Sequence, residues 1–313
     1  MRVKEKVTAW LTLSRCTMYY WALITYSLGA AIAYSQYQTF NGTVFALGYL
    51  CLLLIELNTV FINEYFDYPS DRINLNVGPF NAGSRMLVEG RLSFREVRIG
   101  IVLIAVVLLG AGALLIRATP HIPTVYLLVL AAVALFFGWG YTAPPLKLSY
   151  RTWGELADGL MSGPATVVAG FLLQTGIWTD PVPWLVSTPT FLAMAVAAAL
   201  LAIPDAPADK AIGRQTMAVR FGSRATGAIS IWAVILCAII SVLLWGFGFI
   251  PNPIGIAMLV IVPLAYKIVR PLQQATKTKD EDIHEKAVSE IVPPLIILMT
   301  LVGLIPLLAF VLG

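Results

Sequence analysis

Long apolar segments recur along almost the whole chain, and they constrain its fold more than any other feature. A helix needs about 17–25 predominantly apolar residues to span a lipid bilayer. Nine segments meet this requirement, at 16–34, 44–66, 97–117, 121–141, 157–175, 184–203, 226–249, 253–272 and 291–312. The sequence therefore predicts an all-α integral membrane protein with nine transmembrane helices in a bundle.

The composition supports a membrane location for the whole chain. Hydrophobic residues make up 58% of the sequence and charged residues 12%, with a mean hydropathy of +0.81. A soluble domain usually carries about 25% charged residues. The stretches between the apolar segments include no soluble domain and no long linker. We expect a single domain over residues 1–313, with two pseudo-repeats at 16–141 and 157–272 and a last helix at 291–312.

The positively charged residues are distributed asymmetrically. Twenty of the 21 Lys and Arg residues lie in the N-terminal segment or in and beside the even-numbered loops, and only Arg117 lies on the other side. Positively charged loops of membrane proteins stay in the cytoplasm. We therefore expect a cell-membrane protein with a cytoplasmic N-terminus and, with nine spans, an external C-terminus. The net charge of +4 reflects this topology and does not indicate nucleic-acid binding.

Two sets of polar residues with the same spacing follow apolar segments on the cytoplasmic side. Asn63, Asp67 and Asp71 are four residues apart, and Asp205 and Asp209 repeat this spacing about 140 residues later. On a helix, such residues form one stripe of side chains. Carboxylates beside hydrocarbon are costly unless they are paired or bind a cation. We expect these five residues to bind two or three Mg²⁺ ions; the alternative is that they are solvated helix ends.

Basic residues follow both acidic sets. Arg72 and Arg85 come after the first set, and Lys210 and Arg214 come after the second. In a magnesium diphosphate site, carboxylates hold the metal, the metal bridges phosphate oxygens, and Lys or Arg neutralise the remaining charge. The sequence therefore predicts that such a site lies in a cavity open to the cytoplasm. Alternatively, these cations only anchor the topology.

Glu56 lies inside the second apolar segment. It precedes Asn63 by seven residues and therefore falls on the same helix face. An ionisable residue at this depth is a functional candidate, so Glu56 could bind an acceptor substrate or take up its proton. A protonated Glu56 that hydrogen-bonds between helices is the alternative.

The cysteines and histidines indicate no second cofactor. Cys16, Cys51 and Cys237 are scattered through apolar segments without a Cys-x-x-Cys pair, which predicts buried thiols rather than disulfides or metal ligands. His121 and His284 are too few and too far apart for a haem or zinc site.

The acidic sets carry a resemblance to a known family. Asn63-x3-Asp67-x3-Asp71, together with Asp205-x3-Asp209 and the tail at 210–222, resembles the UbiA superfamily of intramembrane prenyltransferases. The stretch from Tyr141 to Lys147 resembles that family's third signature, between helices four and five. Members transfer a polyprenyl group from an allylic diphosphate to an acceptor, usually an aromatic ring. The chain departs from the family at Leu201, where an Asp or Asn often begins the second motif, which implies a smaller metal set there.

The resemblance implies roles for the candidate residues. Magnesium held by the four aspartates would draw charge from the bridging oxygen of the diphosphate, so that the allylic group ionises. Lys147 would bind terminal phosphate oxygens, or would serve only as a topological anchor. The carbocation must be shielded from water, and the Tyr141 ring could stabilise it by cation–π attraction. Aromatic residues at a membrane interface are also common as belt residues.

The acceptor is suggested by local similarity. The runs at 63–68 and 78–93 are similar to members that act on 1,4-dihydroxy-2-naphthoate in menaquinone biosynthesis, so we expect a polyprenyl diphosphate and this aromatic acceptor as substrates. The alternatives are 4-hydroxybenzoate, a chlorophyllide-like ring or a glycerol-phosphate lipid. We expect membrane lipid around the protein and no obligate protein partner.

Two other function classes fit less well. A cation-coupled transporter would place charge at mid-span and break its inverted repeats, whereas these carboxylates lie at one edge. A phosphatidyl-type transferase would cluster its Asp residues with Gly and Ala-Arg in one tight motif, which this sequence lacks.

Overall fold

The computed structural model describes residues 3–78, 82–278 and 280–313, and its regular structure is almost entirely helical. Seven stretches of helix among these residues are long and apolar enough to cross a membrane. They are α3 (Gly42–Phe66), α5 (Phe94–Ala118), α7 to α8 (Gly154–Thr175), α9 to α10 (Pro181–Leu201), α13 (Ser223–Gly246), η4 to α14 (Ile254–Ala275) and α15 (Glu281–Leu312). The chain is therefore a multi-pass membrane protein, as predicted.

Three of these stretches change helix type or direction along their length. Their parts are α7 (Gly154–Leu160), the π-helical η3 (Met161–Ala165) and α8 (Thr166–Thr175); α9 (Pro181–Val186) and α10 (Thr188–Leu201); and the 3₁₀-helical η4 (Ile254–Val260) and α14 (Ile261–Ala275). Two further helices, α2 (Tyr20–Tyr37) and α6 (Thr124–Gly140), lie where the first and fourth spans are predicted. α6 has only 17 residues and α2 contains four tyrosines; neither is among the seven.

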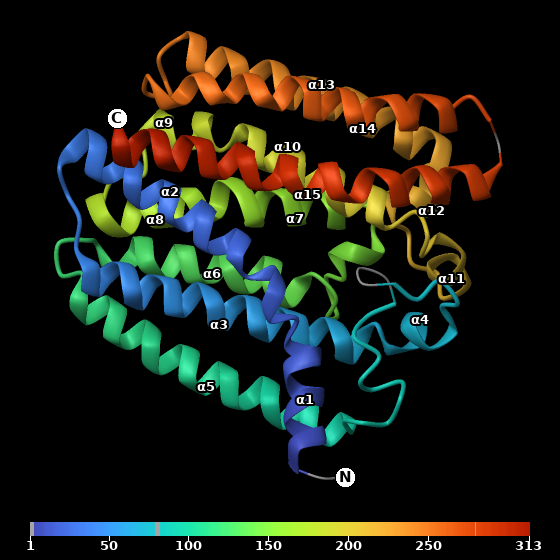
Figure 1. Cartoon of the computed structure of the whole chain (residues 1–313). Coiled ribbons are helices and arrows are strands. Elements are labelled where there is room, and N and C mark those ends of the chain that lie inside the picture. The colour runs from blue at the N-terminus through green and yellow to red at the C-terminus, as the bar shows by residue number, and fades with distance from the viewer. Residues whose placement is uncertain (1–2, 79–81, 279) are drawn as a thin grey trace.

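The long helices run side by side in layers (Figure 1). α13 and α14 form one outer layer, and α3, α5 and α6 lie on the opposite side. Between them, α2 packs against α8 and α15, and α10 packs against α7 and α13. The short helices α4 (Tyr68–Ile73), α11 (Ala206–Ala211) and α12 (Met217–Phe221) gather at one end of the bundle, and the C-terminus lies at the other end.

Glycine allows the close approach of α2 and α8 in the centre. A Cβ atom on Gly29 would overlap the carbonyl oxygen of Val167, and one on Gly170 would overlap the carbonyl oxygen of Tyr26. Small residues at a crossing let membrane helices pack backbone against backbone. Gly29 in the sequence of α2 therefore permits its close packing against α8.

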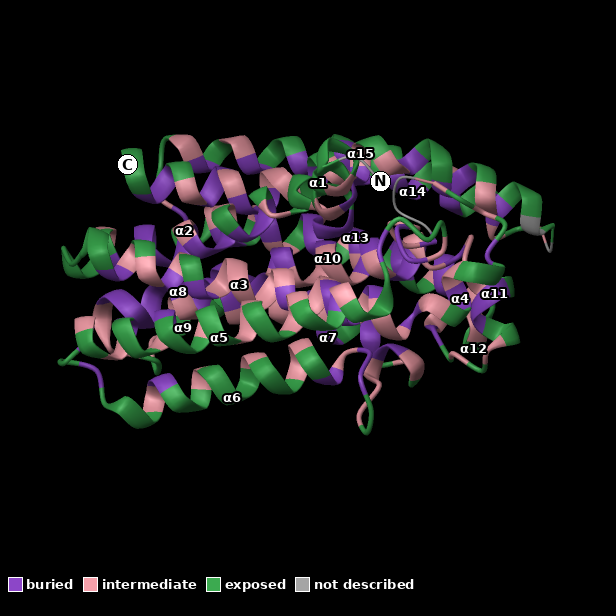
Figure 2. Ribbon diagram, turned by 90° about the horizontal axis from the view of Figure 1, so that it is seen from below, coloured by how far each residue is buried: buried purple, intermediate pink, exposed green. Residues whose placement is uncertain are grey.

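Burial separates the central helices from the peripheral ones (Figure 2). Only 11% of the most apolar stretch of α5 is buried inside the protein, against 61% for Gly154–Thr175. Many of the exposed residues of α5 are large and apolar, among them Val102, Val106 and Leu109. A helix that is apolar on its exposed side is suited to a lipid environment. α5 is therefore peripheral, whereas α7 and α8 belong to the centre.

The N-terminal segment is more regular than the sequence suggested. Val3–Ser14 form α1, which packs against α3 and runs across the direction of the long helices (Figure 1). The chain then turns at Arg15, which has a left-handed backbone (φ 47°), and forms η1 (Cys16–Met18) before α2 begins. Cys16 is exposed on this turn, so its prediction as a buried thiol is wrong. Cys51 and Cys237 are buried, as predicted.

The first acidic set does not lie on one long helix, and the prediction of a continuous stripe is wrong. α3 ends at Phe66 and α4 begins at Tyr68 with Pro69 in its first turn, so Asp67 occupies the junction. Proline suits the first turn of a helix because it lacks an N–H group that would need a partner. The backbone N–H of Asp71 still donates to the Asp67 carbonyl (3.0 Å), which preserves the spacing.

The second acidic set also lies on a short helix rather than on a long one. α10 ends at Leu201, and Asp205 occupies the N-terminal boundary of α11, with Pro207 in the first turn. The backbone N–H of Asp209 donates to the Asp205 carbonyl (2.9 Å). Both acidic sets therefore end on short helices, with Asp71 on α4 and Asp209 on α11.

Candidate active site

The two acidic sets meet at one end of the bundle. The Ser70 hydroxyl of α4 donates to Oδ1 of Asp209 on α11 (2.9 Å). The Asn74 amide donates to Oδ1 of Asp205 (2.7 Å). The structure thus brings together two segments that are more than 130 residues apart in the sequence, at the end where α4 and α11 lie (Figure 1).

Arg214 lies between one carboxylate of each set. Its Nη1 is 3.2 Å from Oδ2 of Asp67 and 3.5 Å from Oδ1 of Asp209. Asp67 is 3% exposed and Asp209 is 1% exposed. Burial raises the pKa of Asp209, and the charge of Arg214 and the hydrogen bond from Ser70 oppose this shift. Two buried carboxylates from different motifs therefore share one cation.

Tyr150 joins Lys147 to the same group. The Tyr150 hydroxyl donates to Oδ1 of Asp67 (3.0 Å), and Lys147 Nζ lies 4.7 Å from the centre of its ring. Arg214 lies over the same ring, with its Cζ 5.4 Å from the centre. Stacking over an aromatic face stabilises a cation. Tyr150 was not among the predicted site residues, because its contact with Asp67 has no sequence signal.

Asn63 and Asp71 complete the first set in different ways. The Asn63 amide donates to Oδ2 of Asp67 (2.9 Å). Burial, followed by the negative charges of Glu64 and Asp67, raises the pKa of Asp71 to about 8. A cation bound beside Asp71 would favour its ionised form. Its carboxylate lies against Gly83, where a side chain would overlap it.

Glu64 organises the segment that covers Asp71. Its carboxylate pairs with the Arg15 guanidinium and accepts hydrogen bonds from the Ser84 backbone N–H (2.8 Å) and hydroxyl (2.6 Å). Glu64 is only 2% exposed. Sequence reasoning did not single out this residue, although an acidic side chain beside Asn63 in an apolar helix was the available signal.

The predicted phosphate-binding cations differ in position. The Arg85 side chain contacts the backbone of the first set, because its Nη1 donates to the Asp71 carbonyl (2.9 Å). Arg72 and Lys210 are exposed on α4 and α11, where they directly follow Asp71 and Asp209. Arg214 and Lys147 are therefore the two predicted cations most closely associated with the carboxylates in this structure.

Tyr141 lies at the C-terminal boundary of α6, and Glu56 lies on α3 seven residues before Asn63. The Tyr141 carbonyl accepts a hydrogen bond from the Ser149 backbone N–H (2.9 Å), and the Ser149 carbonyl accepts one from Arg214 Nε (3.4 Å). Glu56 is half-buried, and its Oε2 has no hydrogen-bond partner among the described residues. Asn58, two residues on, instead bridges helices: it donates to the Ile101 carbonyl (2.8 Å) and accepts from the Trp139 indole (3.0 Å).

The oxygen atoms of the acidic sets suit a divalent cation, but these side chains are not all close together in this structure. Magnesium takes carboxylate oxygens and keeps several waters, and the place between Asp67 and Asp209 already holds the positive charge of Arg214. Within residues 3–78, 82–278 and 280–313, however, no three acidic, histidine or cysteine side chains are close enough together to hold a metal ion. The number of ions therefore stays a prediction.

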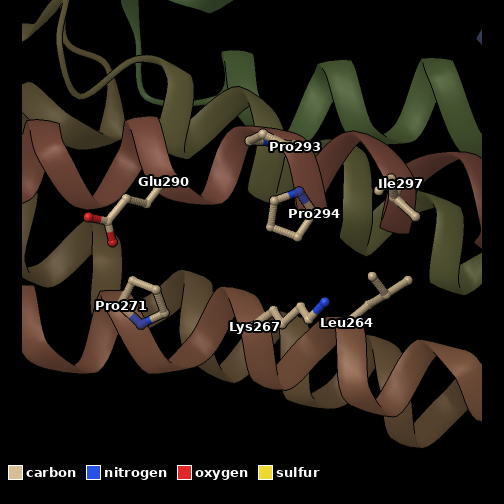
Figure 3. Close-up of a pocket in the computed structure, with 7 residues that line it drawn as sticks. All are labelled: Leu264, Lys267, Pro271, Glu290, Pro293, Pro294 and Ile297. Carbon is tan, nitrogen blue, oxygen red and sulfur yellow. The ribbon is translucent and has the colours of Figure 1, made fainter.

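Two shallow grooves lie elsewhere on the outer surface. The one in Figure 3 runs between α14 and α15 and is lined by Leu264, Lys267, Pro271, Glu290, Pro293, Pro294 and Ile297. The other is formed by residues of α1, α3 and α5, including Trp10 and Phe61. Neither groove contains a residue of the acidic sets. The cytoplasm-facing cavity therefore also stays a prediction.

Fold and site define a multi-pass helical membrane protein with paired acidic motifs at one end. The model of the UbiA prenyltransferase family matches residues 22–286, and the chain belongs to this family, as the sequence resemblance predicted. The chain is therefore a prenyltransferase, an enzyme that transfers an alkyl or aryl group other than methyl.

Several curated proteins are distant relatives. The chain is 27% identical over 219 residues to the 2-carboxy-1,4-naphthoquinone phytyltransferase of Synechocystis sp., a match that covers 69% of this chain and 66% of that protein, just under two thirds. It is 25% identical over 228 residues to the 1,4-dihydroxy-2-naphthoate octaprenyltransferase of Haemophilus influenzae, covering 71% of each.

Solved structures share the fold. A UbiA homolog from Archaeoglobus fulgidus bound to GPP and Mg²⁺ matches with a TM-score of 0.61 and 17% identity, covering 97% of this chain and 99% of that one. A digeranylgeranylglyceryl phosphate synthase matches with a TM-score of 0.64 and 18% identity, covering 98% and 99%. At this identity the likeness concerns the fold alone.

Proposed function

We propose that this prenyltransferase uses Mg²⁺ to transfer a polyprenyl group from an allylic diphosphate to an aromatic acceptor, 1,4-dihydroxy-2-naphthoate. The observation that carries the proposal is the convergence of the buried carboxylates of Asp67 and Asp209 on the half-buried cation of Arg214. A place that holds one cation between two carboxylates is suited to a metal and the diphosphate it binds. The Archaeoglobus homolog that was solved with GPP and Mg²⁺ supports this choice of substrate and metal.

The residues divide into two groups by charge. Asn63, Asp67, Asp71, Asp205 and Asp209 would hold the metal, and Arg214 and Lys147 would bind phosphate oxygens. Bound magnesium would supply positive charge that stabilises the departing diphosphate. Arg85, Arg72 and Lys210 would add positive charge around the entrance.

The reaction needs no oxidant or reductant. The bond between the allylic carbon and the diphosphate oxygen breaks, and its electron pair leaves with the diphosphate. The allylic carbon then forms a new bond to a ring carbon of the acceptor. That ring carbon releases the proton or carboxyl group it carried, and aromaticity returns. Tyr141, which Ser149 joins to Arg214 by hydrogen bonds, would present its ring to the allylic cation.

Two kinds of similarity support 1,4-dihydroxy-2-naphthoate as the acceptor. The runs at 63–68 and 78–93 are similar to members that act on this acceptor; positions 79–81 of the longer run lie outside the described residues. Two distant relatives are named for naphthoate or naphthoquinone substrates. The alternatives are 4-hydroxybenzoate, a chlorophyllide-like ring and a glycerol-phosphate lipid. We do not retain a cation-coupled transporter as an alternative function, because the family assignment makes the chain an enzyme.

For the topology we propose nine spans, with the N-terminus and the acidic end in the cytoplasm and the C-terminus outside. The C-terminus and the helices α4 and α11 lie at opposite ends of the bundle, as this orientation requires (Figure 1). The positive-inside distribution supports it, although Arg2 and Lys279 lie outside the described residues. The division into two pseudo-repeats is part of the same proposal.

The test uses the purified chain in lipid vesicles with radiolabelled geranyl diphosphate. We expect a prenylated product with 1,4-dihydroxy-2-naphthoate and Mg²⁺, and no product after chelation. Parallel reactions contain 4-hydroxybenzoate or a glycerol phosphate as the acceptor. Preferential transfer to one of these would overturn the naphthoate assignment. Full activity after exhaustive chelation would overturn the metal requirement.

A further inference from the structure

The segment at 82–85, which lies beside Asp71, has an unusual backbone. Ala82, Gly83 and Arg85 all have a left-handed conformation, with φ values of 57°, 66° and 63°. Residues other than glycine rarely adopt this conformation, and they keep it only where the surrounding structure holds them there. Strained positions of this kind cluster at functional sites. The contacts of this segment therefore bear on the site beside it.

Hydrogen bonds and apolar packing hold the segment in place. Glu64 on α3 accepts hydrogen bonds from the Ser84 backbone N–H (2.8 Å) and hydroxyl (2.6 Å). The Arg85 side chain donates to the Asp71 carbonyl on α4 (2.9 Å). The two residues that follow are buried in an apolar cluster with residues of α1, α3 and α5. The segment is therefore tied to the two helices that carry the first acidic set.

Gly83 is the point at which this segment meets the Asp71 carboxylate. A Cβ atom on Gly83 would overlap Oδ2 of Asp71 and lie 2.8 Å from its Cγ, and the three atoms nearest to it all belong to this carboxyl group. The left-handed backbone alone does not demand glycine here, because Ala82 and Arg85 carry side chains in the same conformation. What distinguishes Gly83 is the space that the Asp71 carboxylate occupies.

We propose that Gly83 is a positioning residue for the metal site, because it leaves the space in which the Asp71 carboxylate lies and confines that carboxylate to one orientation. This inference rests on the proposed function, in which Asp71 is a metal ligand. Arg85 holds the backbone of Asp71 through its carbonyl, and Gly83 limits its side chain. Neighbouring groups that orient metal ligands matter for binding, and their loss typically weakens metal affinity about 10–100-fold.

The contact predicts a specific effect of a single methyl group at position 83. In Gly83→Ala the new Cβ atom must displace its nearest neighbours, which form the far end of a side chain that can rotate. We therefore expect the Asp71 carboxylate to move and the fold to remain. The variant should lose metal affinity, and it should lose no more stability than a left-handed alanine itself costs.

The experiment compares Gly83→Ala with the matched control Gly90→Ala. Gly90 has almost the same φ (67°), and nothing lies within 4 Å of its added Cβ atom. Mn²⁺ prefers the same oxygen ligands as Mg²⁺, and its binding to the purified chain in nonionic detergent is titrated by electron paramagnetic resonance. We expect both variants to lower Tm in chelator to a similar extent. Only Gly83→Ala should raise the Kd for Mn²⁺, by at least about tenfold.

A double variant tests whether Gly83 acts through Asp71. Asp71→Ala removes the carboxylate, so that an added methyl group at position 83 has nothing to displace. In the Asp71→Ala background, Gly83→Ala should change the Kd for Mn²⁺ less than about twofold, because the effects of residues that act through one another are not additive. A purely structural role of Gly83 would give the same loss of affinity in both backgrounds.

Ser84→Ala gives an independent readout, because it removes one of the two hydrogen bonds that hold the segment to Glu64. It should also raise the Kd for Mn²⁺. Ser289→Ala, at an exposed position of α15, is its control and should leave the Kd unchanged.

Several outcomes would overturn the inference. They are an unchanged Kd in either Gly83→Ala or Ser84→Ala, an equal rise in Gly90→Ala, and additive effects in the double variant. Failure of Gly83→Ala to fold would overturn it as well, because the segment rather than the carboxylate would then have moved. Absence of both Mn²⁺ binding and prenyl transfer in the wild-type chain would instead overturn the proposed function.

Discussion

At the scale of single residues, Arg214 has an unusual position because it holds two carboxylates that are expected to bind metal. If magnesium takes that place, the guanidinium is released toward the diphosphate. The same residue would then stabilise the metal-free site and bind substrate in the loaded one. The contribution of Arg214 can therefore be measured both in the metal-free site and in the site that holds metal and substrate.

The first prediction concerns Arg214→Gln. Removing one partner of a buried ion pair costs about 3–5 kcal/mol, because the other charge stays buried and unpaired. We expect a lower Tm for the variant in chelator and a larger rise of Tm on addition of Mg²⁺ than in the wild-type chain. Arg117→Gln, an exposed cation at the end of α5, is the control. An equal rise of Tm in all three proteins would contradict the position of Arg214.

The second prediction concerns Lys147, which lies over the Tyr150 ring beside Asp67. Lys147→Ala should raise the apparent Kd for the allylic diphosphate and leave that for the acceptor nearly unchanged. Lys147→Arg should restore part of the affinity, because a planar guanidinium replaces the charge but not the compact geometry. Binding of each substrate is titrated separately, with the exposed Lys277→Ala as the control. Small and equal changes for both substrates would remove Lys147 from the site.

Site residues with a repeated spacing could be predicted from the sequence. Residues that contact the site only because distant segments pack together could not. Asp67 and Asp209 stand out in the sequence because charge beside an apolar segment is costly and the spacing recurs. Tyr150 was not identified, because its contact with Asp67 depends on which helices pack together. Glu64 lies between these cases: its depth was visible in the sequence, but its partners Arg15 and Ser84 were not.

At the scale of elements, the apolar segments predicted where helices occur but not where they bend. Pro69 and Pro207 begin new short helices, so the acidic sets turn away from α3 and α10. This change of direction allows Ser70 to contact Asp209 and Asn74 to contact Asp205. The four-residue spacing therefore identified residues that meet at one site, although they do not form a continuous stripe on one helix.

The third prediction concerns the crossing of α2 and α8. Gly29→Val would place side-chain atoms where the Val167 carbonyl lies, and the two helices would have to separate. Overpacking of this kind costs about 1–3 kcal/mol or more, so we expect a clearly lower Tm in detergent. Gly110→Val on α5 is the matched control, because nothing lies within 4 Å of its added Cβ atom. Equal Tm values for the two variants would contradict the close crossing.

At the scale of the whole molecule, the distribution of charge and the positions of the ends support one orientation. The helices α4, α11 and α12 lie together at one end, and the C-terminus lies at the other (Figure 1). The exposed apolar residues of α5 cover a side of the bundle that suits lipid. The arrangement of the helices and the charge distribution in the sequence therefore favour the same orientation, with the acidic end in the cytoplasm.

The fourth prediction is the sidedness of two positions. After Cys16, Cys51 and Cys237 are replaced, a single cysteine is placed at Lys277 or at Gln38, both of which are exposed. An impermeant thiol reagent added to intact cells should label the Gln38 position and not the Lys277 position, which should react only after permeabilisation. The reverse pattern would invert the proposed topology.

The central claim is that Asp67 and Asp209, from two distant segments, form one metal-dependent site for prenyl transfer. The most direct measurement is the rate of transfer from geranyl diphosphate in Asp67→Asn and Asp209→Asn, with Asp282→Asn as the control. We predict that each site variant loses at least about 10²–10³ of kcat, as when charge stabilisation of a transition state is removed, while the control retains the wild-type rate. Near-normal transfer in both site variants would contradict the account, because the two motifs would then be solvated helix ends.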